Sequence, residues 1–367
     1  MLRSIDVRLA AVDRLRGLVI VVMALDHVRD YFSNAEFDPV DLQHTTPGYF
    51  ATRWITHFCA PVFMFLAGAA VALRERRSGR AGLASFLARR GAFLIVLEIT
   101  VVHVGWKLDL HYPRVRLMVV WALGGAMLTL AALLLLRLST RTIAIFGLVV
   151  ITGHNLLDGL HPGGPWRIPW SMLHEPGEHP LLGSHGLFVL YPLVPWVGVM
   201  ALGYVLGPLL DAEDERRRRT LRVLGGALIL AFVVLRLVNR YGDPMPWSSQ
   251  PRGAAYTLLS FLNLEKYPPS LDYLLATLGP ALLVLPALGR LQGRCARFLE
   301  TFGRVPLFFY VVHIYVIHLS ALVIGRAFPL PGVYVVWLAV VLVLLPACAW
   351  YGRLRARRRD LAWLSYL

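Results

Sequence analysis

Long apolar runs alternate with short polar segments along most of the chain. A helix that crosses the hydrocarbon core of a bilayer takes about 20 mainly apolar residues. The pattern therefore predicts an all-α polytopic membrane protein with about ten transmembrane helices, whose boundaries are loose because several runs are short. The predicted spans are 15–33, 57–73, 89–104, 115–136, 140–155, 187–208, 220–238, 268–288, 303–325 and 330–351.

The composition agrees with this pattern. The 367 residues are 57% hydrophobic and 16% charged, whereas soluble domains have roughly 45–50% apolar and about 25% charged residues. A soluble enzyme and a disordered chain are therefore excluded. The cysteines Cys59, Cys295 and Cys348 are too few for a disulfide framework or a thiolate metal cage, so we expect them to be packing residues.

The positive charge predicts the orientation. The chain has a formal net charge of +15, and most of its Lys and Arg fall in alternate loops, as the positive-inside rule requires when both termini are cytoplasmic. The run Arg355 to Arg359 predicts a basic cytoplasmic tail at 352–367. Charges at the ends of spans make nucleic-acid binding an unnecessary explanation.

The histidines, unlike the Lys and Arg residues, are concentrated on the predicted external side. None of the 12 lies in a predicted internal loop or tail, and most lie near the external ends of spans. An external loop from Gly163 to Gly183 contains His174, Glu175, Glu178 and His179 without hydrophobic periodicity, and we interpret it as an ordered loop or lid. Chemistry is therefore expected on the external side.

The first span carries the strongest polar pattern. Arg16 and His27 are eleven residues apart, which returns them to one helix face and separates them by roughly 16 Å along the axis. Asp26 and Asp30 lie within one turn of His27, so one of them can fix its tautomer and make it a better base. The alternative is that Arg16 snorkels to headgroups and that the polar residues from Asp26 to Asp30 only mark the helix end.

Other ionisable residues lie within or beside predicted spans. Glu98 is near the external end of the third, and His313 and His318 are on the ninth, where five residues place them about 140° apart. This spacing does not suit a shared metal, and we predict no metal site. We assign Glu98, His313 and His318 to the acceptor site or to the lining of its cavity, with a packing role as the alternative for either histidine.

A second polar group precedes the eighth predicted span. Lys266 and Tyr267 stand directly before Pro268 and Pro269, and Lys107 is the only other lysine in the chain. A proline pair is compatible with a helix start. We therefore interpret Lys266 and Tyr267 as candidate acceptor-site residues, with a solvated interfacial lysine as the alternative.

No phosphate loop, serine elbow or Cys-x-x-Cys pair is present. What remains is a base without a protein nucleophile. An activated histidine such as His27 deprotonates an acceptor hydroxyl or amine, which then attacks an activated acyl group held beside it.

Several segments together resemble bacterial membrane proteins similar to the catalytic domain of heparan-α-glucosaminide N-acetyltransferase. This resemblance covers most of the chain, and the combination is more specific than any one segment. The segments are Arg14–Gly17 with Asp26–His27, Thr56–Gly68, Tyr191–Gly203, Lys266–Ser270 with Leu278–Pro280, and Leu307–His318.

The resemblance extends to the wider integral-membrane acyltransferase superfamily, in which an Arg and a His are separated by ten residues in the first span. It implies that His27 is catalytic and that Arg16 helps to hold the phosphates of a donor. The donor would be acetyl-CoA or another acyl-CoA from the cytoplasm, used as a co-substrate without a permanently bound cofactor. The acceptor would be a sugar-like hydroxyl or amine on the external side.

The chain departs from the heparan-modifying enzyme in one respect. There the active histidine lies in the loop after the equivalent span, where this chain has only His44 at a different offset. The arrangement around His27 resembles the O-acyltransferase pattern more closely.

The leading hypothesis is a bacterial inner-membrane acyltransferase that modifies carbohydrate, with residues 1–351 as one transmembrane acyltransferase-like domain. The alternative is a proton-coupled transporter or flippase for a small or sugar-like substrate, in which the same charges line a route. A membrane scaffold explains neither His27 nor Lys266. The sequence leaves open whether the chain forms a homo-oligomer.

Overall fold

The computed structural model describes residues 2–181, 183, 185–325, 328–358, 360–361 and 364. The chain is mostly helical, as predicted, and clusters into two compact units. Unit 1 comprises Met1–Cys59, Trp247–Asn263 and Ala281–Leu367, and unit 2 comprises Ala60–Pro246 and Leu264–Pro280.

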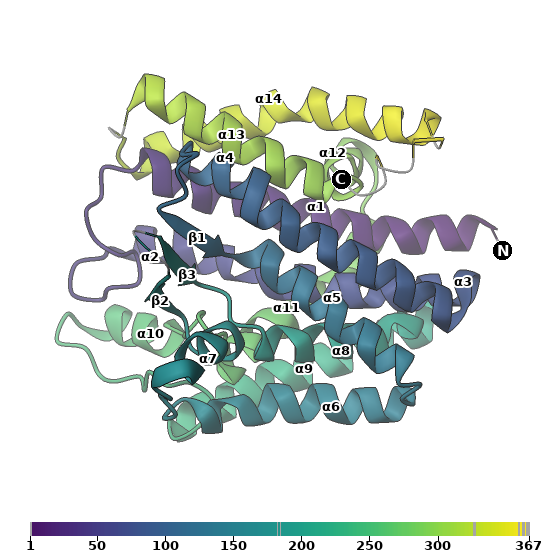
Figure 1. Ribbon diagram of the computed structural model, residues 1–367, viewed down its shortest axis with the longest axis horizontal. Coiled ribbons are helices and arrows are strands. Elements are labelled where there is room, and N and C mark those ends of the chain that lie inside the picture. The colour runs from purple at the N-terminus through teal and green to yellow at the C-terminus, as the bar shows by residue number, and fades with distance from the viewer. Residues whose placement is uncertain are drawn as a thin grey trace. The chain divides into compact units, whose positions relative to one another are not determined.

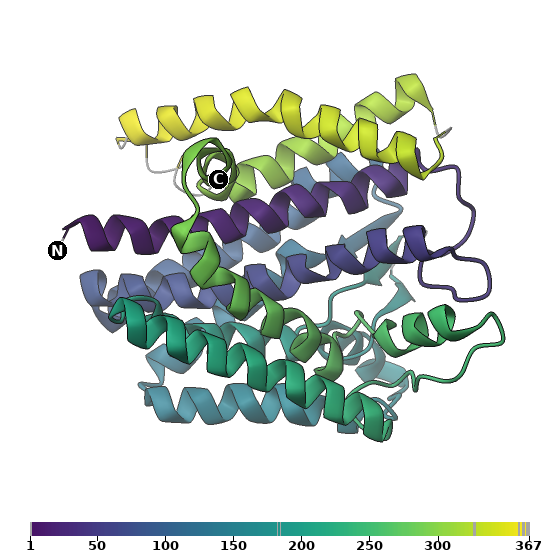
Figure 2. The same ribbon diagram turned by 180° about the vertical axis from the view of Figure 1, so that it is seen from behind.

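Unit 1 is built around a single long helix. Helix α1 packs against α12, α13 and α14, and Figures 1 and 2 show it running beside the last two. A Cβ at Gly17 would lie 1.9 Å from the carbonyl oxygen of Leu299, so glycine is what permits the close approach of α1 and α12. The helices are α1 (Leu2–Phe32), α2 (Pro47–Ile55), η1 (Thr56–Phe58), α10 (Ala254–Leu262), α12 (Gly293–Gly303), α13 (Pro306–Ile324) and α14 (Leu330–Arg357).

Unit 2 contains the helices from the middle of the chain. Helix α8 packs against α5 and α6, and Gly198 of α8 faces Gly147 of α6, with the carbonyl oxygen of Gly147 3.0 Å from the position of an added Cβ. The elements are α3 (Cys59–Leu97), η2 (Glu98–Val102), α4 (His103–Lys107), α5 (Val119–Leu135), α6 (Thr140–Gly153), η3 (His154–Leu157), η4 (Gly164–Trp166), α7 (Arg167–Leu173), α8 (Val194–Leu210) and α9 (Asp214–Val238). Helix α11 (Leu271–Arg290) contributes its first half to unit 2 and its second half to unit 1.

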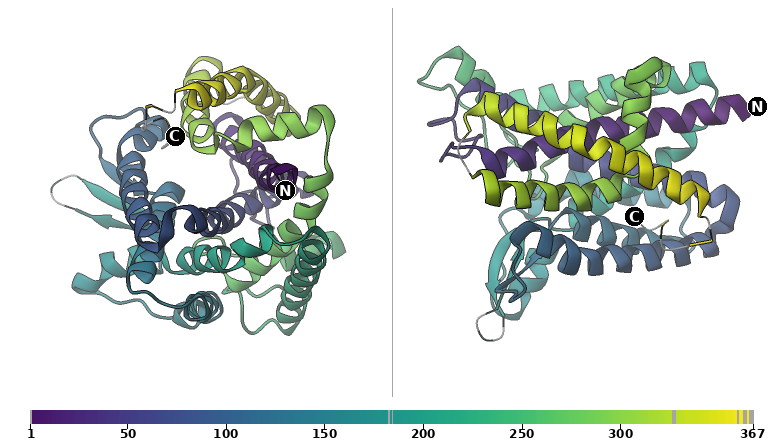
Figure 3. Two further views of the ribbon diagram at one scale, coloured as in Figure 1. Left: turned by 90° about the vertical axis from the view of Figure 1, so that its right-hand side faces the viewer. Right: turned by 90° about the horizontal axis from the view of Figure 1, so that it is seen from above.

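A three-stranded sheet lies at the N-terminal end of α5 in unit 2 (Figures 1 and 3). Its order is β1-β3-β2, with β1 parallel and β2 antiparallel to β3. In the register Val115 pairs with Leu187, and His179 pairs with the same residue from the other side. The strands are β1 (Arg114–Leu117), β2 (Gly177–Pro180) and β3 (Gly186–Val189).

The sheet changes the predicted starts of two spans and gives secondary structure to one predicted loop. The spans predicted to begin at 115 and 187 begin with strands, and their helices start only at Val119 and Val194. The predicted loop at 163–183 contains α7 and β2, while residue 182 lies outside the described residues. Short apolar strands merge with a following apolar helix in a hydropathy pattern, because periodicity does not separate such short runs.

Six segments of the described chain are long and apolar enough to cross a membrane. Helices α5 and α8 are apolar but shorter, and α1 has the length but carries four charged residues from Arg16 to Asp30. The number ten and the cytoplasmic location of both termini stay predictions. The division into a domain at 1–351 and a tail at 352–367 also stays a prediction, and α14 continues to Arg357. The six segments are Pro47–Glu75, Thr140–Leu157, Asp214–Val238, Leu271–Arg290, Pro306–Ile324 and Leu330–Arg357.

Candidate active site

His27 lies on α1 in contact with a histidine of α13. Its Nδ1 is 2.7 Å from Nε2 of His313, and the two rings stack with centroids 4.9 Å apart. His313 is fully buried, whereas His27 is partly exposed. The Nδ1 of His313 is 3.0 Å from the carbonyl oxygen of Phe309, one turn earlier on α13. These contacts form a chain from a backbone carbonyl to the partly exposed imidazole.

This chain of contacts fixes the tautomers of both rings. A carbonyl oxygen only accepts hydrogen bonds, so Nδ1 of His313 donates to Phe309. In the neutral ring the Nε2 of His313 is then an acceptor, and Nδ1 of His27 donates to it. The neutral His27 ring therefore has its lone pair on Nε2, which is the form that a general base requires.

The two aspartates beside His27 contact arginines. Asp26 forms an ion pair with Nη2 of Arg29 at 2.8 Å and a further one with Arg53 of α2. The same Nη2 of Arg29 donates to Asp30 at 2.6 Å. The described contacts thus place His313 against Nδ1 of His27, and the assignment of Asp26 or Asp30 as the residue that orients His27 stays a prediction.

The next turn of the same helix pair carries a second aromatic contact. The hydroxyl of Tyr31 is 3.4 Å from Nδ1 of His318, and the ring centroids are 4.8 Å apart. His313 and His318 therefore both contact α1, although five residues separate them on α13. The long side chain of Tyr31, one turn after His27, reaches the second histidine.

Arg16 lies toward the other end of α1. The helix is continuous from Leu2 to Phe32, so Arg16 and His27 share it at a separation of roughly 16 Å. Arg16 forms an ion pair with Asp13 at 3.6 Å, and Asp13 also faces Arg304 at 3.8 Å. Glu300 also pairs with Arg14 and Arg304, each at 2.8 Å. Three arginines and two carboxylates thus leave this cluster with an excess of positive charge, which suits phosphate groups.

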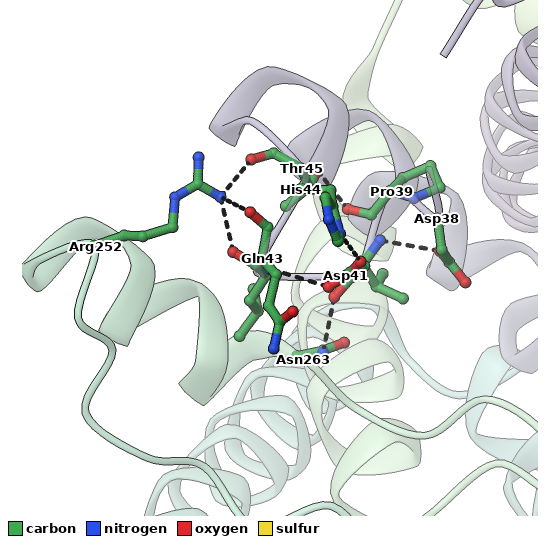
Figure 4. Close-up of polar contacts among 10 residues, drawn as sticks. Asp38, Pro39, Asp41, Gln43, His44, Thr45, Arg252 and Asn263 are labelled. Carbon is green, nitrogen blue, oxygen red and sulfur yellow. Dashed lines mark hydrogen bonds and ion pairs between the residues drawn. The ribbon is translucent and has the colours of Figure 1, made fainter. Parts of the chain in front are cut away.

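The loop between α1 and α2 holds His44, and Figure 4 shows how it is fixed. Nδ1 of His44 is 2.5 Å from Asp41 Oδ2. The Nη1 of Arg252 donates to the carbonyls of Leu42, Gln43 and Thr45 at 2.8, 3.1 and 2.9 Å. Because the His44 side chain is 65% exposed, this histidine–carboxylate pair lies in a markedly wetter environment than the His27–His313 pair.

Lys266 and Tyr267 belong to unit 2. Lys266 is buried, and its Nζ lies 5.2 Å from the centroid of the Tyr267 ring. The preceding Glu265 accepts from the Tyr267 amide at 2.8 Å, and its own amide donates to Asp243 at 2.9 Å. Burial raises the pKa of both Glu265 and Asp243. Asp243 escaped the sequence analysis because it stands in a turn far from the Lys266 segment.

Glu98 is also in unit 2 and is almost fully buried. Its Oε2 accepts from the amides of Val120 and Trp121 at 2.8 and 2.9 Å. These amides belong to the first turn of α5 and have no acceptor within the helix, so Glu98 caps that helix. The contacts explain its burial, and its predicted place in an acceptor cavity stays a prediction.

The fold is that of a helical membrane protein, and its first long helix carries His27 with a defined tautomer. The family model described as heparan-alpha-glucosaminide N-acetyltransferase, catalytic, matches residues 8–237. This is more than half of the chain, and the chain belongs to that family, which supports a membrane acetyltransferase activity. The match includes Arg16 and His27 but ends before Lys266 and His313. A comparison with curated proteins gives no match.

Proposed function

We propose that the chain moves an acyl group, expected to be acetyl, from cytoplasmic acyl-CoA to a sugar-like hydroxyl or amine on the external side of a bacterial inner membrane. His27 is the general base and His313 is its positioning residue. The observation that carries the proposal is the hydrogen-bond chain from Phe309 through His313, because it leaves the lone pair on Nε2 of His27.

The reaction balances with these groups alone. Nε2 of His27 takes the proton of the acceptor O–H or N–H while the acceptor atom attacks the thioester carbonyl. The C–S bond of the tetrahedral intermediate then breaks, and the CoA thiolate leaves with the proton that His27 returns. Arg16 is assigned to the donor phosphates. His318, which is in the same unit as His27, is assigned to the acceptor, and the acceptor roles of Lys266 and Tyr267 stay predictions from the sequence.

The test uses purified protein in detergent with radiolabelled acetyl-CoA, and it measures binding and slow thioester hydrolysis without an acceptor. We expect His27→Ala to lower the rate by about 100-fold or more, the usual contribution of a positioned base, with acetyl-CoA still bound. His103→Gln is the matched control, because His103 is a buried histidine of unit 2. Monodisperse elution of both variants establishes folding.

Wild-type turnover in His27→Ala contradicts the assignment of the base. Substrate flux in sealed vesicles without consumption of acyl-CoA contradicts acyl transfer and favours the transporter alternative.

A further inference from the structure

Three side chains gather at the end of α6 in unit 2, outside the proposed active site. His154 begins η3, Asp158 follows it, and His174 ends α7. Each offers one nitrogen or oxygen atom, and these atoms lie within 4.8 Å of one another. The fold thus brings together two histidines that are 20 positions apart in the chain, with a carboxylate between them.

Three of the four ring nitrogens of this cluster are buried without a described hydrogen bond. His154 and His174 are each 2% exposed. Among the described residues, neither nitrogen of His154 nor Nδ1 of His174 has a hydrogen-bond partner. Burial of an imidazole that lacks partners is unfavourable, and an ion is one of the standard explanations for such groups in a native fold. The described protein residues therefore do not satisfy the buried nitrogens of this cluster.

The carboxylate is held in place by its neighbours. His174 Nε2 lies 3.1 Å from Asp158 Oδ1, and Asn155 Nδ2 donates to Oδ2 at 2.9 Å. Asn155 is itself fixed by the amide of Leu271, which donates to its Oδ1 at 3.0 Å. Although burial raises the pKa of Asp158, the hydrogen bonds from His174 and Asn155 outweigh it and leave that pKa below its ordinary value.

The contact between His174 and Asp158 has the geometry of two ligands of one ion. Nε2 of His174 lies 3.1 Å from Oδ1 of Asp158, and because the two nitrogens of an imidazole point away from each other, Nε2 is the nitrogen that can share an ion with this carboxylate. The ion would replace the proton of Nε2, since a ligating histidine is neutral. His154 offers the third ligand atom, because neither of its ring nitrogens has a described hydrogen-bond partner.

We propose that His154, Asp158 and His174 bind a divalent transition-metal ion. Two imidazoles and one carboxylate are a ligand set that suits zinc and its neighbours. Zn–N bonds of about 2.0–2.1 Å place two ligands of a tetrahedral ion roughly 3.4 Å apart, so the cluster needs only small adjustments. Asp158 is 25% exposed, which leaves water access to the fourth position. The ion would connect the end of α6 to α7, and this proposal does not depend on the acyltransferase activity.

The test uses full-length protein purified without a histidine tag and stripped of metal with a chelator. Co²⁺ alone is the probe, because its visible absorption reports bound nitrogen and oxygen ligands, and Zn²⁺ should displace it. We expect one ion per chain. His154→Ala and the near-isosteric Asp158→Asn should each weaken binding by more than about 100-fold, beyond the 10–100-fold typical of residues that only orient a ligand.

His179→Gln is the matched control. His179 of β2 is 4% exposed and has no described partner at either nitrogen, but it is not part of the cluster. The variant should bind Co²⁺ like wild type. Equal binding by wild type and both cluster variants, binding by none of them, or loss of binding in His179→Gln alone overturns the proposal.

Discussion

Two pairs of histidines in this chain differ in the hydrogen-bond partners of their ring nitrogens. In unit 1, His27 and His313 contact each other, and the chain of contacts ends at the carbonyl of Phe309. In unit 2, His154 and His174 bury three ring nitrogens for which the described residues provide no hydrogen-bond partner. Both pairs join helices of one unit. In the first pair, hydrogen bonds within the protein fix which ring nitrogens carry protons, as a proton-transfer site requires. In the second pair, a bound ion would be the missing partner of the buried nitrogens.

The largest effect should come from breaking the first pair. His313→Leu removes the acceptor for Nδ1 of His27, so the tautomer with its lone pair on Nε2 is no longer selected. We expect acetyl-CoA hydrolysis to fall about 10- to 100-fold through kcat, less than the roughly 100- to 10,000-fold contribution of a general base because His27 itself remains, while KM for acetyl-CoA is unchanged. Steady-state kinetics across pH measure both parameters.

His313→Gln is the conservative variant for this prediction. Its amide oxygen can accept from His27 and its amide N–H can donate to Phe309, so it should recover part of the lost kcat. A purely structural role for His313 would give equal losses for leucine and glutamine, with an unchanged pH profile.

A smaller effect should be a change in the free energy of unfolding that has opposite signs for the two pairs of histidines. His313→Leu should lower the free energy of unfolding by about 1–3 kcal/mol, because the buried imidazole contact of His27 is lost. In metal-free protein, His154→Leu should be neutral or stabilising, because it replaces an imidazole that has no partner with an apolar side chain. Denaturant unfolding in detergent with a chelator measures both. Destabilisation of similar size in the two variants would remove the distinction drawn between the pairs.

The helices were largely predictable because apolarity repeats over long stretches. The predicted spans 140–155 and 303–325 closely enclose or match α6 and α13. The sheet was not predictable, because Gly186–Val189 is only four residues long and its hydropathy continues into α8. Its pairing with Arg114–Leu117 depends on residues more than 70 positions away.

The candidate site was predicted in its residues but not in its contacts. Helical spacing placed Arg16 and His27 on one helix, and His313 was identified by its position in a predicted span. The contact between His27 and His313 joins residues 286 positions apart, and it follows from the packing of α1 on α13, which spacing within one helix does not encode. Asp158 was missed because no local pattern links it to His174.

The smallest effects should come from His44, the exposed histidine that competes with His27 as a base. His44→Ala should change acetyl-CoA hydrolysis less than about 3-fold, far below the usual contribution of a positioned base. The hydrogen bond from His44 holds the pKa of Asp41 below its usual range, so in this variant that pKa should rise toward its ordinary value. Because the bond favours the ionised carboxylate, the stability that it adds is present above the unfolded pKa and lost as pH falls through the folded one. Carbon NMR of labelled aspartate measures the shift, and a loss of turnover as large as that of His27→Ala would move the catalytic base to His44.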